Sequence, residues 1–371
     1  MPTTRPLIHL IAGARPNFMK IAPLMRAIAA DGRLQARLIH TGQHFDRDMN
    51  DVFFQELGIP TPDVRLNCGG GTHAEQTGKI MVAYEACVSA ERPACCLVVG
   101  DVNSTLACAI VAKKAGVPVA HVEAGLRSGD RGMPEEINRL VTDAITDWFF
   151  VTEPSGRTHL LREGQLSDAI HDVGHVMVDN LLYQAAKLER DFETATLETD
   201  GVKRQLGRYA VVTLHRPSNV DGEENLRRAA GVVNALATEV PVVFPMHPRT
   251  RKNLEMLGIQ LAANVHVLGP QSYMSFLHLW KDAAVVLTDS GGLQEETTAL
   301  GVPCVTMRES TERPVTVDEG SNVLAGTDPA RVLEACRQVL AGHGKVGRRP
   351  ALWDGMAAER IVRELVRRLQ A

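Results

Sequence analysis

The sequence contains no apolar stretch that approaches the roughly 18 residues of a membrane-spanning helix. The short apolar run over residues 7–14 includes His9 and is followed by Arg15, so we interpret it as a first β-strand and not as a targeting segment. The chain also lacks an excess of positive charge, because 40 Lys and Arg stand against 44 Asp and Glu, a formal net charge of −4. We therefore expect neither nucleic acid nor a membrane as a partner, and any bound phosphate must be held locally.

Several common signatures of metal and cofactor binding are also missing. The seven cysteines are odd in number and form no C-x-x-C pair, and the histidines lack the spacing of zinc ligands. There is no G-x-G-x-x-G fingerprint for a dinucleotide, and no G-x-S-x-G, Walker A or kinase motif. We therefore expect reduced thiols in a cytoplasmic protein that uses no metal and no cofactor.

The 371 residues exceed a typical domain length of about 150 more than twofold, which favours two domains. Short apolar runs rich in β-formers alternate with helical patterns, which predicts βαβ units around parallel sheets and hence an α/β fold. These predicted strands cover residues 7–11, 36–40, 96–99, 118–122, 148–151, 209–214, 242–245, 265–268, 285–287 and 304–307.

A polar segment near residues 185–205 separates the two series of strands. We expect an N-terminal domain over residues 1–185 and a C-terminal domain over residues 200–371. In an alternative arrangement, the last helix packs back on the N-terminal domain.

The two halves resemble each other. Acids that end neighbouring predicted strands lie 22 residues apart in the first half, at Asp101 and Glu123, and 20 apart in the second, at Asp289 and Glu309. This repeat predicts two Rossmann-like, doubly wound domains. Ligands of such sheets bind beyond the carboxyl ends of the strands, so we expect the active site in a cleft between the domains.

Two segments that follow strands and open helices are candidate phosphate sites. Residues 13–20 would direct backbone N–H groups at an anion, although an ordinary tight turn is the alternative. In the second segment, Ser290 can both cap the helix and donate to a phosphate, and two glycines admit a close approach of backbone to ligand. Glu296 can then accept both hydroxyls of a ribose; the alternative is a capped helix with a solvated acidic first turn.

Carboxylates and basic residues also follow predicted strands. Asp101 and Glu123 end two strands that should be neighbours, and Glu135 and Glu136 lie in the loop beyond. Clustered carboxylates suit acid–base chemistry, although Asp101 could instead cap a helix, and Glu135 and Glu136 could instead favour a helix N-terminus. His215-Arg216 and residues 246–249 place basic groups at successive strand ends, which suits a diphosphate. We interpret His121 as a satisfied core histidine.

These segments together resemble a known family, the non-hydrolysing UDP-N-acetylglucosamine 2-epimerases. The matching motifs occur in the family's order between residue 7 and about residue 325: GARPNFMKIAPL, HTGQHFD, VVGDVNSTLA, HVEAGLRSGDRGMPEEINR, VTLHRP, PMHPRTR, LTDSGGLQEETTALGVPC and MRESTERP. The family has a two-domain fold of the glycosyltransferase-B type, in keeping with the repeat.

The resemblance implies roles for individual residues. Glu296 would bind the ribose, and UDP would be held by Arg15, His215, His247, Ser290, Gly291, Gly292, Glu296 and Arg313. The catalytic carboxylates would be Asp101, Glu123 and Glu135, assisted by Lys20, Arg139, His215 and His247. Some members bind a second UDP-GlcNAc as an activator; Gln43 and His44 match that motif, whereas Asp46 and residues 69–73 do not.

The resemblance implies epimerisation at C2 of UDP-N-acetylglucosamine to give UDP-N-acetylmannosamine. UDP is expelled as the C2 proton is lost, and it adds back to the resulting 2-acetamidoglucal. The alternatives are a related substrate such as a UDP-2,3-diacetamido-uronic acid, a hydrolysing epimerase, a glycosyltransferase of the same fold, and a non-catalytic UDP-sugar sensor. We also expect a homodimer.

Overall fold

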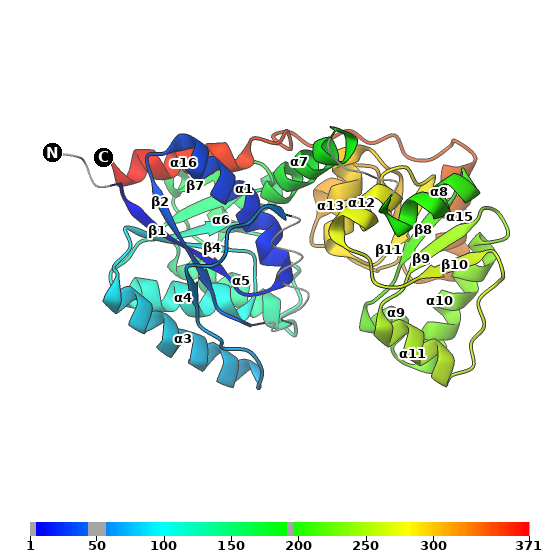
Figure 1. Ribbon diagram of the computed structural model, residues 1–371, viewed down its shortest axis with the longest axis horizontal. Coiled ribbons are helices and arrows are strands. Elements are labelled where there is room, and N and C mark those ends of the chain that lie inside the picture. The colour runs from blue at the N-terminus through cyan, green and yellow to red at the C-terminus, as the bar shows by residue number, and fades with distance from the viewer. Residues whose placement is uncertain (1–4, 44–56, 191–195, 371) are drawn as a thin grey trace. The chain divides into compact units, whose positions relative to one another are not determined.

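The computed structural model describes residues 5–43, 57–190 and 196–370 (Figure 1). The chain divides into two compact units. The first contains the residues up to 183 together with those from 351 onward, and the second contains residues 184–350. The C-terminal helix therefore belongs to the first unit, which is the alternative arrangement considered for it above.

The described part of the first unit is built on a seven-stranded parallel sheet in the order β3-β2-β1-β4-β5-β6-β7. Its strands are near-continuous apolar runs, as in β4, where all five residues are buried, because helices cover both faces. The strands are β1 Leu7–Ala12, β2 Gln35–His40, β3 Val64–Arg65, β4 Cys95–Val99, β5 Val119–Val122, β6 Trp148–Val151 and β7 Ile170–Asp172.

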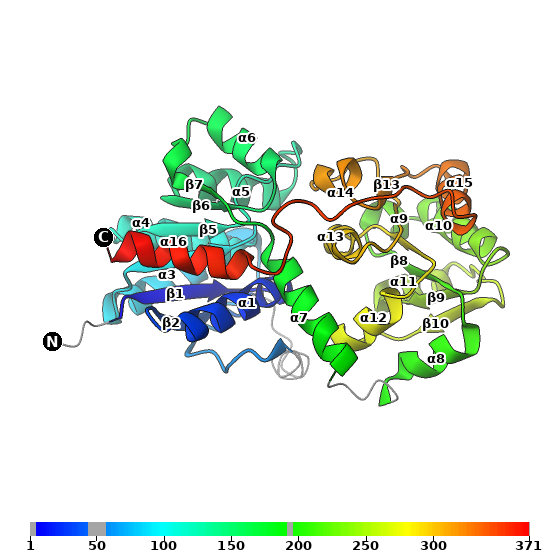
Figure 2. The ribbon, with the colours of Figure 1, turned by 90° about the horizontal axis from the view of Figure 1, so that it is seen from above.

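Helices α3, α4 and α5 pack in sequence on one face of this sheet, and α1 and α16 pack together on the other (Figures 1 and 2). Pro at the first or second position of α1, α5 and α6 favours helix initiation there. The helices are α1 Arg15–Asp31, α3 His73–Ala90, α4 Asn103–Lys114, α5 Pro134–Ile145, α6 Pro154–Arg162, α16 Ala357–Leu369 and the 3₁₀ turn η1 Ser167–Ala169; α7 Val176–Arg190 runs from the first unit into the second.

The second unit repeats this plan with a six-stranded parallel sheet in the order β10-β9-β8-β11-β12-β13. Its strands are β8 Ala210–Thr213, β9 Val242–Pro245, β10 Val265–Leu268, β11 Val285–Thr288, β12 Cys304–Thr306 and β13 Asn322–Leu324. Its helices are α8 Glu198–Leu206, α9 Pro217–Val220, α10 Glu223–Leu236, α11 Pro248–Met256, α12 Tyr273–Trp280, α13 Gly291–Leu300, α14 Pro314–Asp318 and α15 Pro329–Leu340.

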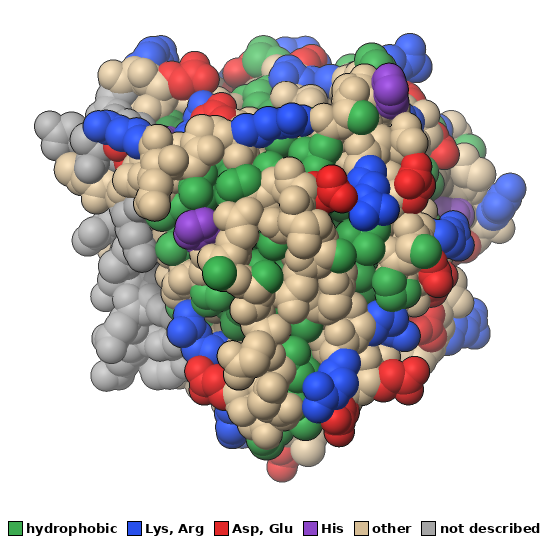
Figure 3. Space-filling view, turned by 90° about the vertical axis from the view of Figure 1, so that its right-hand side faces the viewer, with side chains coloured by type: hydrophobic (Ala, Val, Ile, Leu, Met, Phe, Trp, Pro, Cys, Tyr) green, Lys and Arg blue, Asp and Glu red, His purple; other side chains and the backbone are tan. Residues whose placement is uncertain are grey.

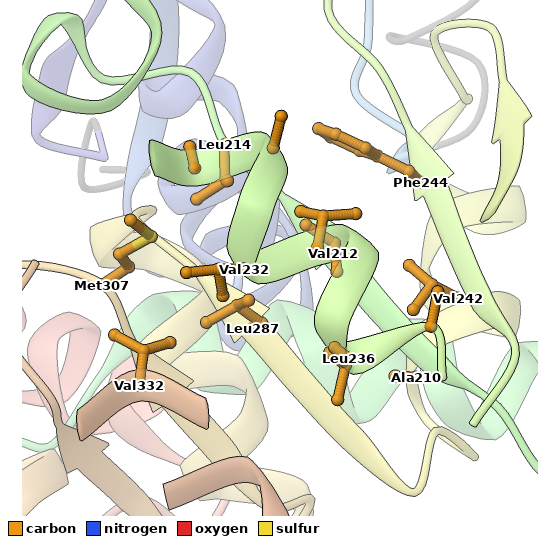
Figure 4. Packing of buried hydrophobic residues seen from close by; sticks show 14 of the residues in the cluster. Ala210, Val212, Leu214, Val232, Leu236, Val242, Phe244, Leu287, Met307 and Val332 are labelled. Carbon is orange, nitrogen blue, oxygen red and sulfur yellow. The ribbon is translucent and has the colours of Figure 1, made fainter. Parts of the chain in front are cut away.

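The core of the second unit lies between its sheet and helices α10 and α15 (Figure 4). Val212, Leu287 and Phe244 come from three strands and meet Val232 and Val332 from the helices. Full burial of one such side chain contributes about 1.5–3 kcal/mol. This packing fixes the strands whose carboxyl ends carry the polar segments described below.

The strand order reverses direction at equivalent places in the two sheets, between β1 and β4 in the first and between β8 and β11 in the second. Ligands of doubly wound sheets bind at the carboxyl ends of the strands beside such a reversal. A site is therefore expected after β1 and β4 in the first unit, and after β8 and β11 in the second.

The surface face drawn in Figure 3 carries interspersed positive and negative side chains, so it presents no continuous basic field. Across the described residues, no helix is both long and apolar enough to span a membrane.

Candidate active site

A buried ion pair lies at the carboxyl edge of the first sheet. Glu123 directly follows β5, and its carboxylate pairs with the ammonium group of Lys20 from α1. Both side chains are buried. Glu123 has a φ of 72°, a left-handed conformation that is uncommon for a residue with a side chain. The backbone here is thus held in a costly geometry that aims a carboxylate at the strand edge.

Gly100, at the end of β4, makes room for this pair. Its φ is +66°, and a Cβ atom at this position would lie 2.8 Å from Nζ of Lys20. Any larger residue would therefore push the ammonium group away from Glu123.

A second charged group follows Gly100. Asp101 accepts a hydrogen bond from Nη1 of Arg139 at 2.7 Å, and Nε of Arg139 donates to Oε2 of Glu136 at 3.0 Å. Glu136 also accepts the backbone N–H groups of Ser128 and Gly129 at 2.9 and 3.0 Å. Burial alone would raise the pKa of Glu136, but these bonds and the Arg139 charge outweigh it and hold that pKa below its usual value. Glu136 is therefore an anion, and it holds the Arg139 guanidinium in place.

Glu135, the expected third catalytic carboxylate, is exposed in the first turn of α5. Its inward-facing neighbour Glu136 is the residue that joins the charged network. Arg15 begins α1, but its side chain is outside the described part of the structure, and His44 lies outside the described residues. Gln43 accepts hydrogen bonds from the N–H and hydroxyl of Ser104 in the first turn of α4.

The expectation that the turn after β1 presents free N–H groups to an anion is wrong for two of them. The N–H groups of Gly13 and Ala14 donate to Oδ1 of the buried Asn17 at 3.1 and 3.0 Å. The amide of Asn17 also donates to the carbonyl of Val99. Asn17 thus fastens β1 to β4 and satisfies these donors internally.

In the second unit, Ser290 occupies the N-cap position of α13. Within the described structure its hydroxyl makes no capping hydrogen bond, so the expected capping role is wrong and the hydroxyl stays available to a ligand. Gly291 and Gly292 form the first turn of this helix, whose N–H groups and dipole favour an anion.

Asp289, directly after β11, orients His215 at the end of β8. Asp289 is fully buried and accepts the backbone N–H groups of His215 and Arg216, while Nδ1 of His215 lies 2.9 Å from its carboxylate. Burial opposes ionisation, but His215 and the hydrogen bonds hold the pKa of Asp289 below its usual value. The half-exposed His215 ring therefore keeps Nδ1 toward Asp289 and leaves Nε2 for a ligand.

The carboxylate of Glu296 is buried in α13 and accepts a hydrogen bond from the Tyr273 hydroxyl at 3.1 Å. Burial and the Glu296 charge raise the pKa of Tyr273 well above its usual value, so its hydroxyl stays protonated and donates. A carboxylate offers about four lone-pair positions, and this bond uses one of them.

Arg313 is held near the same helix, because its Nε donates to Glu295 at 2.7 Å. A Cβ atom on Gly291 would lie 3.7 Å from the guanidinium of Arg313. Beside it, burial opposes ionisation of Glu312, but the doubly hydrogen-bonded Arg308 lowers its pKa to about 2. Arg313 thus adds a positive charge beside the glycine turn.

His247 is exposed and caps α11, where its Nδ1 accepts the N–H of Arg249 at 3.2 Å. With Nδ1 as the acceptor, the neutral ring carries its proton on Nε2, which suits donation to a phosphate oxygen. Among the described residues, no group of three His, Cys, Asp or Glu is placed to hold a metal ion.

Comparison with known proteins identifies the family. The family model described as UDP-N-acetylglucosamine 2-epimerase matches residues 26–366. This chain belongs to that family. The family is one of isomerases, and its fold is the glycosyltransferase-B type.

Named relatives cover nearly the whole chain. A UDP-N-acetylglucosamine 2-epimerase of Methanococcus maripaludis is 40% identical over 342 residues, 91% of this chain and 92% of that protein. A UDP-2,3-diacetamido-2,3-dideoxy-D-glucuronate 2-epimerase of Pseudomonas aeruginosa is 41% identical over 336 residues, 90% of this chain and 92% of that protein. The structure of Methanocaldococcus jannaschii UDP-GlcNAc 2-epimerase with UDP-GlcNAc and UDP has a TM-score of 0.86 and 38% identity, covering 97% of this chain and 99% of that one.

For two residues that join the charged groups of the site, the sequence did not reveal the partner that the structure shows. Glu136 could have been noticed from its spacing to Arg139, because residues three apart on a helix are neighbours. Asp289 was considered as an acid that ends a predicted strand, and no local pattern reveals that it binds His215, 74 positions away.

Proposed function

We propose that this protein interconverts UDP-N-acetylglucosamine and UDP-N-acetylmannosamine without hydrolysis. The observation that carries the proposal is the family match over residues 26–366. The two polar strand edges support it, because one offers paired carboxylates and cations and the other offers a helix N-terminus with a buried carboxylate.

In this proposal, Ser290, Gly291 and Gly292 bind the diphosphate through a hydroxyl and backbone N–H groups, and Glu296 binds the ribose. His247 and Arg313, together with Arg15, supply further donors to the phosphates. His215, oriented by Asp289, donates from Nε2 to the leaving diphosphate.

The carboxylates Asp101, Glu123 and Glu135 supply the groups that take and return the C2 proton. As the C1–O bond breaks, its electron pair leaves with UDP and C1 gains oxocarbenium character. The neighbouring C2–H bond is then acidic enough for a carboxylate to remove the proton, and a C1–C2 double bond forms. Lys20 pairs with Glu123 and Arg139 pairs with Asp101, and these contacts fix where the two carboxylates lie.

A closely related substrate is the second candidate. The Pseudomonas aeruginosa relative, 41% identical, is named for a 2-epimerase activity on a diacetamido-glucuronate nucleotide. The same groups would serve C2 of that sugar, whereas different C3 and C6 substituents would require different contacts.

Proton NMR of the protein with single UDP-sugars in heavy water, with no acceptor present, tests the proposal. We expect UDP-N-acetylmannosamine with deuterium at C2. Free UDP and N-acetylmannosamine would instead indicate a hydrolysing epimerase, and binding without conversion a sensor. Conversion of the diacetamido-uronic acid nucleotide alone would establish the second candidate.

A further inference from the structure

His121 lies in β5, two residues before Glu123, and its ring is fully buried. Its Nε2 lies 2.8 Å from the carbonyl oxygen of Gly100, and its Nδ1 lies 2.7 Å from Oδ1 of Asp143 on α5. A carbonyl oxygen can only accept a hydrogen bond, so Nε2 carries a proton.

Asp143 is surrounded by donors. Its Oδ2 accepts the backbone N–H of Gly125 at 3.0 Å and lies 2.8 Å from Nη2 of Arg127. Burial opposes ionisation of this carboxyl, but His121 and Arg127 outweigh it and hold the pKa of Asp143 below its usual value. The ring of His121 therefore joins the carbonyl of Gly100 to the carboxyl of Asp143.

This group connects the segments that carry the proposed catalytic carboxylates. Gly100 directly precedes Asp101, and His121 and Gly125 flank Glu123 on either side. Glu123 itself has a left-handed backbone, which costs of order 1–3 kcal/mol and persists only where the surroundings enforce it. The ring of His121 is hydrogen-bonded to the carbonyl of Gly100, and Asp143 accepts the N–H of Gly125. These contacts restrain the backbone at both strand ends.

We propose that His121 and Asp143 are positioning residues, which fix Asp101 and Glu123 at the separation that proton transfer requires. The inference rests on the proposed function. In this proposal neither residue contacts the substrate. Both act through the backbone at the ends of β4 and β5. A misplacement of about 1 Å at a reacting group can cost roughly 10²-fold in rate.

The positioning role is tested with Asp143→Asn, which keeps the shape but removes the charge. We expect kcat to fall roughly 10–100-fold, while KM and the affinity for UDP stay near wild type, because the nucleotide is bound by other residues. Asp147→Asn is the matched control: Asp147 accepts the N–H of Val119 and pairs with Lys113, so it anchors the opposite end of the same strand. Its kcat should remain within about twofold of wild type.

The outcomes separate the two proposals. If wild type converts UDP-sugars and Asp143→Asn keeps full kcat with only a lower melting temperature, the pair is merely structural and the inference is wrong. If Asp143→Asn does not fold, His121→Gln is measured in the same way. If wild type converts no UDP-sugar, the proposed function fails, and the positioning role fails with it.

Discussion

The two units share one strand order around their central reversal, yet they place different chemistry at the same edge. The first unit places two ion pairs there: Lys20 with Glu123, which is buried, and Arg139 with Asp101, which is partly exposed. The second places Ser290, two glycines and the N-terminus of α13. Proton transfer needs carboxylates that are charged and held in place, whereas diphosphate binding needs small residues and free backbone N–H groups.

The difference also appears in the turn after the first strand of each sheet. In the first unit, Asn17 occupies the N–H groups of Gly13 and Ala14. In the second, Asp289 occupies those of His215 and Arg216, but thereby orients a histidine ring that stays half exposed. The same topology thus carries different side chains at its two edges, which fits the proposed division into a catalytic edge and a nucleotide-binding edge.

The largest expected effect comes from removing a carboxylate of the first unit. Asp101→Asn or Glu123→Gln keeps the shape and removes the titrating group, so epimerisation should fall by roughly 10²–10⁴-fold. The affinity for UDP, measured by calorimetry, should not change. Asp172→Asn is the control, because Asp172 is an exposed carboxylate at the end of an edge strand and pairs with Arg157. A loss of UDP affinity with full turnover would contradict the assignment of proton transfer to the first unit and UDP binding to the second.

Much of this division was predictable from the sequence, because parallel strands bring their carboxyl ends to one edge. The positions of Asp101, Glu123 and Ser290 after their strands follow from that rule. The sequence could not tell which of Glu135 and Glu136 turns inward, since this depends on how α5 packs. Contacts between distant residues, such as Asn17 with Val99, leave no local pattern.

A smaller effect is expected from the binding edge of the second unit. Glu296→Ala removes charge-assisted hydrogen bonds to the ribose and should weaken UDP binding by about 1–3 kcal/mol. Turnover at saturating substrate should be affected less than in the Asp101 variant. Glu309→Gln, an exposed carboxylate of the same unit, serves as the control. Unchanged UDP affinity in Glu296→Ala would refute the ribose assignment.

Acid should destabilise the first unit through its buried histidines. Burial lowers the pKa of His9 to about 4 and that of His40 to about 4. An unfolded chain takes up these protons below about pH 6.5, so the stability due to the neutral rings is present above that pH and is lost as the pH falls toward 4. The protonated Tyr84 hydroxyl, which lies 3.2 Å from Nδ1 of His9, favours the neutral ring further.

His9→Gln should therefore flatten the fall of the unfolding free energy between pH 6.5 and 4, by on the order of 2 kcal/mol at pH 5. Urea unfolding across this pH range measures the slope. The exposed His343, in the second unit, gives the control variant His343→Gln, which should keep the wild-type slope. If the unfolding free energies of wild type and His9→Gln fall in parallel as the pH is lowered, His9 does not contribute to acid sensitivity.

The smallest effect is expected at Tyr273, which donates to Glu296 at 3.1 Å. A carboxylate offers about four lone-pair positions, so Tyr273 can hold one oxygen while ribose hydroxyls use the others. Tyr273→Phe removes this restraint with little change of volume, and UDP binding should weaken by about 0.5–1.5 kcal/mol, less than in Glu296→Ala. Calorimetry of both variants and of the double variant gives the coupling between the two side chains. Tighter UDP binding by Tyr273→Phe would mean that the tyrosine competes with the ribose for the carboxylate instead of orienting it.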